Sequence, residues 1–91
     1  MRIDLLLKYL CLVKSRSQAR RGCDEGAIKL NGKRVSAHKE VKVGDVIEIS
    51  YPSKELVVSI KEVPLRQISK KDRELYYSVI RERKKDKGVD L

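Results

Sequence analysis

The stretch that decides how this chain folds is Lys14-Ser15-Arg16-Ser17-Gln18-Ala19-Arg20-Arg21. It holds four cations and two hydroxyls and contains no acid. Ser15 followed by Gln18 fits a capping box, in which the two side chains satisfy exposed backbone N–H groups, so the stretch predicts the start of a helix. A helix N-terminus carries partial positive charge and free N–H donors, and the added cations predict a phosphate site there.

A short apolar helix is predicted before this stretch. Its inward face follows i, i+3, i+4, i+7 spacing at Ile3, Leu6, Leu7 and Leu10. The second helix is expected over about residues 16–25, with Ala19 and Cys23 as its small inward residues. Gly26 then fits the left-handed position that ends a helix.

The rest of the chain predicts strands and one more helix. Asn31-Gly32 between two short alternating runs is a strong hairpin signal, because both residues tolerate positive φ. Strands are expected over 46–49 and 56–60, and Ile28, Leu30 and Val35 are expected to point to the core. Ser69 with Asp72 is a second capping-box candidate, which predicts a helix to about Lys85 with an apolar stripe of Leu75, Tyr76, Val79 and Ile80. The order predicts an α+β domain: two N-terminal helices on a small, mostly antiparallel sheet, with a C-terminal helix.

Composition limits the function classes. The chain has 91 residues, enough for one small domain, with 22 Lys and Arg against 13 Asp and Glu and a net charge of +9. Such a charge favours a polyanion, either RNA, DNA or an acidic membrane surface. Lys8 and Asp4 break the apolar N-terminal segment, which is far shorter than the roughly 20 residues that span a bilayer. We therefore expect a cytoplasmic protein without a membrane partner.

Catalytic and metal chemistry are not expected. Cys11 and Cys23 lack CxxC spacing, and His38 is the only histidine. No nucleophile–base pair or Gly-rich phosphate loop is present, so we expect no cofactor and no enzymatic activity. The two cysteines are expected as buried free thiols on apolar helix faces. Asp4 is expected to pair with a nearby arginine such as Arg20, and His38 is expected to be a loop residue.

These residues, in this order and spacing, resemble the S4 RNA-binding domain. The motifs that carry the resemblance are Arg2-Ile3-Asp4, Lys14 to Arg20, Gly26, Asn31-Gly32-Lys33 and Val41 to Ile47. The resemblance implies an S4-like fold, the alpha-L motif, over 1–50. Residues 51–91 form a C-terminal extension of the same compact unit, with a highly charged tail from Lys84 to Leu91 that is expected to fray. The extension resembles small stand-alone members: the RqcP-like proteins of bacterial ribosome-associated quality control and a related heat-shock S4 protein.

The resemblance implies a non-catalytic protein of the large ribosomal subunit. It would contact the ribosomal RNA of that subunit and P-site peptidyl-tRNA on stalled subunits, and support C-terminal tailing of the nascent chain beside a tRNA-recruiting factor. By match to the motifs of the S4 RNA-binding domain, Arg2 and Arg16 are the first residues expected to bind RNA. The full set of expected RNA-binding residues is Arg2, Lys8, Lys14, Ser15, Arg16, Ser17, Arg20, Arg21, Lys33 and Arg34.

Two alternatives stay open at this point. A heat-shock-type factor would recycle subunits that hold trapped peptidyl-tRNA. A DNA-binding module would read the two helices as a helix-turn-helix, but the cations of the second helix lie at its start rather than along a base-reading face. With only one aromatic residue, Tyr9, in the first fifty positions, structured RNA is favoured over single strands.

Overall fold

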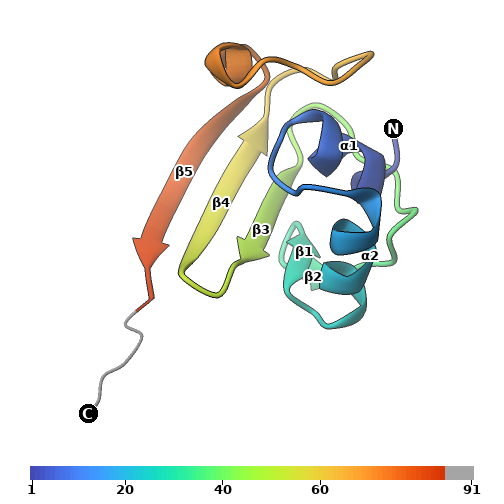
Figure 1. The fold of residues 1–91 in the computed structure, drawn as a ribbon, viewed down its shortest axis with the longest axis vertical. Coiled ribbons are helices and arrows are strands. Elements are labelled where there is room, and N and C mark those ends of the chain that lie inside the picture. The colour runs from blue at the N-terminus through green and yellow to red at the C-terminus, as the bar shows by residue number, and fades with distance from the viewer. Residues whose placement is uncertain (86–91) are drawn as a thin grey trace.

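The computed structural model describes residues 1–85, which form two helices, five strands and one 3-10 helix. The elements are α1 (Ile3–Tyr9), α2 (Arg16–Asp24), β1 (Ile28–Leu30), β2 (Lys33–Arg34), β3 (Val46–Ser50), β4 (Lys54–Ile60), η1 (Lys70–Leu75) and β5 (Tyr77–Lys84). The strands make one antiparallel sheet in the order β2-β1-β3-β4-β5. In Figure 1 the helices lie beside β1–β3, at the side of the molecule away from β5. The predicted α+β class, with N-terminal helices on an antiparallel sheet, is confirmed.

The core lies between the helices and the sheet. Ile3, Leu6 and Leu7 are fully buried, as the spacing in α1 predicts. From the sheet, alternate residues of β3 and β4 face them, because successive side chains of a strand point to opposite faces. Ile47 and Val58 are cross-strand partners there, and both are fully buried.

The start of α2 is capped as predicted, with one difference. The Ser15 hydroxyl oxygen accepts a hydrogen bond from the backbone N–H of Gln18 at 3.1 Å. The Gln18 side chain accepts in return from the backbone N–H of Lys14 at 2.7 Å, one residue earlier than a capping box requires. Gly26, at φ +77°, follows the end of the helix. The two side-chain hydrogen bonds therefore fix the start of α2, and Gly26 follows its end.

The predicted hairpin is also present. Asn31 and Gly32 have φ of 51° and 84°, and Leu30 pairs with Lys33 across the turn. The Asn31 side chain accepts a hydrogen bond from the backbone N–H of Val46 at 2.9 Å, which ties the hairpin to β3. Val35 is half-buried against the core.

The predicted C-terminal helix is wrong. Ser69 precedes only the short η1 and makes no side-chain cap hydrogen bond, and the chain then enters β5. β5 pairs with the whole of β4, from Ile60 opposite Tyr77 to Lys54 opposite Lys84. An exposed β4 edge offers a row of backbone partners, and that pairing outweighs the helical spacing of the apolar residues. The last six residues of the tail expected to fray, 86–91, lie outside the described residues.

The prediction for Cys11 is also wrong, whereas that for Cys23 is confirmed. Cys23 is a buried free thiol of α2. Cys11 is half-buried beyond the end of α1, with φ of +62°. The chain turns there because the backbone N–H groups of Leu12 and Val13 both donate to the carbonyl of Leu7, which brings those two apolar residues into the core.

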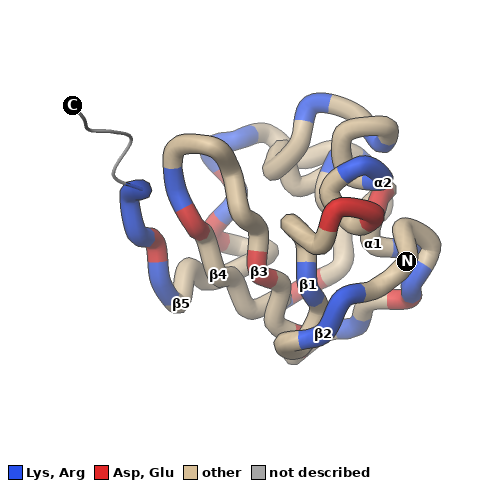
Figure 2. Tube along the Cα trace, turned by 90° about the horizontal axis from the view of Figure 1, so that it is seen from below, with Lys and Arg blue, Asp and Glu red and all other residues tan. Residues whose placement is uncertain are grey.

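Charge is spread over two parts of the molecule. Figure 2 shows lysines and arginines near α2 and β2 on one side and along β5 on the other, with acids between them. The expected RNA-binding residues all fall within residues 2–34, so none of them lies on β5.

Candidate nucleic-acid interface

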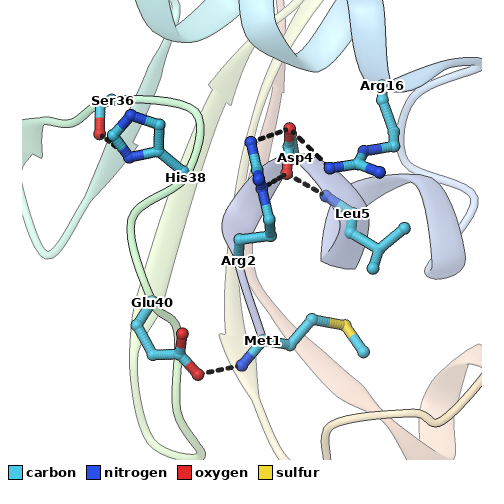
Figure 3. Close-up of polar contacts among 8 residues, drawn as sticks. All are labelled: Met1, Arg2, Asp4, Leu5, Arg16, Ser36, His38 and Glu40. Atoms are coloured by element: carbon cyan, nitrogen blue, oxygen red, sulfur yellow. Dashed lines mark hydrogen bonds and ion pairs between the residues drawn. The ribbon is translucent and has the colours of Figure 1, made fainter.

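The first turns of α1 and α2 meet at the carboxylate of Asp4. Arg2 donates from Nε to Asp4 Oδ1 at 2.8 Å and from Nη2 to Oδ2 at 3.1 Å. Arg16 donates from Nη2 to Asp4 Oδ2 at 3.4 Å. Figure 3 shows the two guanidinium groups approaching the carboxylate from two sides. One buried acid therefore places two arginines from different elements next to each other.

Asp4 stays ionised in this position. Its side chain is fully buried, which by itself would raise the pKa of the carboxyl. Hydrogen bonds from Arg2 and from the backbone N–H of Leu5, together with the charge of Arg16, outweigh burial and hold the pKa below its ordinary value. A buried charge is stable only when it is paired in this way. Asp4 pairs with nearby arginines, as expected, but these are Arg2 and Arg16 rather than Arg20, the example given, because Asp4 lies beside the start of α2.

The two arginines keep part of their surface in solvent. The side chains of Arg2 and Arg16 are 41% and 39% exposed. Arg16 contacts Asp4 through one nitrogen only, and its Nε is buried without a hydrogen-bond partner among the described residues. Since a guanidinium carries five N–H donors, most of those of Arg16 remain for another acceptor.

A shallow depression joins these groups into one surface, here called the Arg16 face. Its members are Arg2, Arg16, Arg20, Ser36 and His38. The Ser36 hydroxyl and His38 Nδ1 lie 3.2 Å apart. Asp24 also lines the depression and Asp4 lies buried beneath it, so three cations stand against two acids at this surface. The three guanidinium groups of such a surface can together bind an anion.

Ser36 and His38 were missed as members of this surface. The segment that holds them reaches the start of the chain through an isolated bridge between Arg2 and Glu40. The backbone N–H of Asp4 also donates to the carbonyl of Ala37 at 3.0 Å. No local pattern predicts a contact between residues so far apart in the sequence.

The other expected residues lie outside the Arg16 face. Lys33 and Arg34 line a second depression at the hairpin, and Arg34 donates to the backbone carbonyl of Asp24. Lys8 donates to the Gln67 side chain at 3.2 Å. Three further residues belong to α2 or its approach: Ser15 caps the helix, while Ser17 and Arg21 are exposed on it. Lys14 lines a separate groove, described below.

Metal binding and membrane insertion bear on what this site can do. Within residues 1–85, no three His, Cys, Asp or Glu side chains gather in a way that would hold a metal ion. None of the helices in that range has both the length and the apolar character needed to cross a membrane.

The fold and this arginine cluster define the class of protein. The S4 domain family matches residues 1–47, the part that contains both helices, the hairpin and the start of β3. The fold is shared with Heat Shock Protein 15 of Vibrio cholerae, at a TM-score of 0.81 and 24% identity over 87% of this chain and 80% of that one. A solution structure of a hypothetical protein, HP1423, has a TM-score of 0.73 and 40% identity over 87% and 95% of the two chains.

Relatives with similar sequences show to which group within the S4 domain family the chain belongs. A protein of Helicobacter pylori named RQC P-site tRNA stabilizing factor is 42% identical over 84% of this chain and 92% of its own length. A protein of the same name from Bacillus subtilis is 33% identical over 92% and 96%. The chain belongs to the S4 domain family and, within it, to the group of RQC P-site tRNA stabilizing factors.

Proposed function

We propose that this protein binds RNA without catalysing a reaction, and that it stabilises P-site peptidyl-tRNA on stalled large ribosomal subunits during ribosome-associated quality control. It contacts the ribosomal RNA of that subunit and the tRNA, and so supports C-terminal tailing of the nascent chain by a factor that recruits tRNA. Its place of action is the cytoplasm, where ribosomes work. The observation that carries the proposal is the pair Arg2 and Arg16, held next to each other by the buried Asp4 and partly open to solvent.

The chemistry of the Arg16 face suits an RNA backbone. A guanidinium presents paired donors that match the oxygens of a phosphate, and charge-assisted bonds of this kind are strong. Arg20 lies one turn after Arg16 and lines the same depression, so successive phosphates of one strand can be held. Because proteins recognise A-form RNA largely through its shape, phosphates and 2′-hydroxyls, a preset row of cations is sufficient for binding.

Two observations favour this role over the alternatives. The relatives of 33% and 42% identity bear the quality-control name, whereas the likeness to Heat Shock Protein 15, at 24% identity, concerns the fold. A helix-turn-helix reader of DNA needs base-reading side chains along its recognition helix. Of the three cations of α2, Arg16 and Arg20 instead lie on the Arg16 face, and Arg21 lies in the last turn outside it.

The test is co-sedimentation of the full chain with purified large subunits that carry peptidyl-tRNA. Arg16→Ala should weaken binding about tenfold or more, because a hydrogen bond to a charged group contributes about 1.5–3 kcal/mol. Arg66→Ala is the matched control, since Arg66 is an exposed arginine in the segment between β4 and η1. Circular dichroism should show both variants folded, because Arg2 still pairs with Asp4 when Arg16 is removed. Equal binding by the wild type and folded Arg16→Ala would refute the proposal, as would tighter binding of the wild type to duplex DNA than to structured RNA.

A further inference from the structure

A second cationic concavity lies on the other side of the first turn of α2. Four elements contribute to its walls: the link between the helices, strands β4 and β5, and η1. In Figure 1 the helices lie beside β1–β3 and away from β5. The charged residues that line this groove are Lys14, Lys54, Lys70, Arg73 and Glu82. It is here called the Lys70 groove.

Specific side-chain contacts hold parts of the groove wall together. The Tyr51 hydroxyl donates to the backbone carbonyl of Leu12 at 2.6 Å, which fastens the link between the helices to the β3–β4 turn. Burial raises the pKa of Tyr51 to about 12, further above neutral pH than that of an ordinary tyrosine. The Lys54 ammonium lies 5.6 Å from the centre of the Tyr51 ring, a cation–π contact. The position of one wall relative to the other is therefore fixed.

The charges in the groove are strongly unbalanced. Glu82 is the one acid among the described lining residues, and Lys54 neutralises it with an ion pair at 3.1 Å. Lys14, Lys70 and Arg73 form no ion pair with any residue in 1–85. Three unpaired cations thus face one concave surface, and such a surface attracts a polyanion.

We propose that the Lys70 groove binds the sugar–phosphate backbone of an RNA segment different from the one on the Arg16 face. The inference rests on the proposed function and assigns a second contact to it. Lys14 immediately precedes the helix cap Ser15, and Arg16 immediately follows it, so the two surfaces flank one turn of α2. A protein of this size can thereby hold two RNA segments in a fixed relation.

The residue types favour RNA over a protein partner. Protein–protein interfaces are depleted in lysine, whereas three of the four cations here are lysines. The groove also lacks an open aromatic platform, because Tyr77 is buried and Tyr51 is half-buried with its hydroxyl bonded to Leu12. Contact with the backbone, rather than stacking of bases, is therefore expected.

Site-directed photocrosslinking of the full chain bound to large subunits with peptidyl-tRNA tests this inference. A photoreactive residue replaces Val79, which lines the groove and is 53% exposed, or His38 on the Arg16 face. Both positions should label RNA, at different nucleotides. Lys70→Ala with Arg73→Ala should lower RNA labelling from position 79 at least fivefold and change labelling from position 38 less than twofold. Lys29→Ala with Arg66→Ala, the same change of charge on exposed residues elsewhere, should alter neither.

The outcomes separate the two proposals. RNA labelling from position 38 with none, or only protein, from position 79 would overturn the groove and leave the proposed function standing. Labelling of the same nucleotides from both positions would also overturn a separate groove site. If neither position labels RNA, the proposed function fails and the groove fails with it.

Discussion

Asp4 is the single residue on which the candidate interface depends. Two arginines from different elements would repel each other without an anion between them. Asp4 supplies that anion from a fully buried position, so its negative charge is hidden while parts of both guanidinium groups remain outside. The carboxylate therefore holds two guanidinium groups side by side at the surface, and its own charge offsets one of theirs.

Replacing Asp4 with Asn should destabilise the protein by about 1–3 kcal/mol at pH 7, because two guanidinium groups lose their charged partner. The folded pKa of Asp4 lies below its ordinary value of about 3.9, so its contribution to stability is present above that pH and disappears as the pH falls through the folded pKa. The difference between wild type and variant should thus shrink below about pH 4. Urea unfolding at a series of pH values measures it.

Asp24→Asn is the matched control for that experiment, since Asp24 is an exposed carboxylate on the same surface. Its effect should stay within about 0.5 kcal/mol. A gap between wild type and Asp4→Asn that persists unchanged at pH 2 would contradict the assigned ion pairs.

Sequence reasoning predicted the prominent arginines but not their partner. Arg2, Arg16 and Arg20 do share one surface, as the motif and the four-residue spacing of the last two indicate. Asp4 does pair with nearby arginines, but with Arg2 and Arg16 rather than Arg20, because the choice between neighbouring arginines depends on how α1 crosses α2. The separation of Lys14 from Arg16 was also not predicted. Lys14 precedes the cap, where the backbone has not yet entered the helix.

At the scale of elements, the cap of α2 sets where the cationic turn begins. Ser15→Ala removes the acceptor of the Gln18 N–H and should lower the free energy of unfolding by about 1 kcal/mol. Ser17→Ala is the control, because Ser17 is exposed within the helix and its side chain makes no hydrogen bond to residues 1–85. Urea denaturation followed by circular dichroism measures both. Equal loss in the two variants would mean that Ser15 does not act as the cap.

β5 shows where local pattern fails. Leu75, Tyr76, Val79 and Ile80 follow a helical spacing, yet Val79 and Ile80 are more than half exposed in a strand. Their β-branched side chains suit a strand as well as a buried stripe, so the spacing alone does not decide. The deciding interaction is the pairing with β4, which lies far upstream in the sequence and is invisible in any short window.

Two alanine variants distinguish the strand from the predicted helix. In the strand Tyr77 is 7% exposed and Ile80 is 57% exposed. Tyr77→Ala should therefore destabilise the protein by about 3 kcal/mol, since truncation of a buried aromatic residue leaves a cavity. Ile80→Ala should change stability by less than about 0.5 kcal/mol. In a helix, Ile80 would be the buried residue, so the reverse order in thermal or urea unfolding would contradict β5.

For the molecule as a whole, the lysines and arginines of the described residues gather on different sides of the fold, near α2 and β2 and along β5. The composition alone predicted a polyanion partner, and the N-terminal pattern predicted the α+β class. Neither indicated a second concave surface, because Lys14, Lys54, Lys70 and Arg73 come from separate segments that meet through the Tyr51–Leu12 hydrogen bond as well as the β4–β5 pairing. Residues that are scattered in the sequence become one site when the last strand completes the sheet.

The salt dependence of binding to large subunits carrying peptidyl-tRNA tests whether both surfaces act together. Each neutralised phosphate adds about −0.7 to −0.9 to the slope of log K against log salt. Arg16→Ala and the pair Lys70→Ala/Arg73→Ala should each make the slope shallower by about one such step per lost contact. Because the two surfaces are separate, the changes should add in the combined variant. The control Lys29→Ala/Arg66→Ala should keep the wild-type slope. If its slope changes as much as that of Lys70→Ala/Arg73→Ala, binding responds to total charge alone.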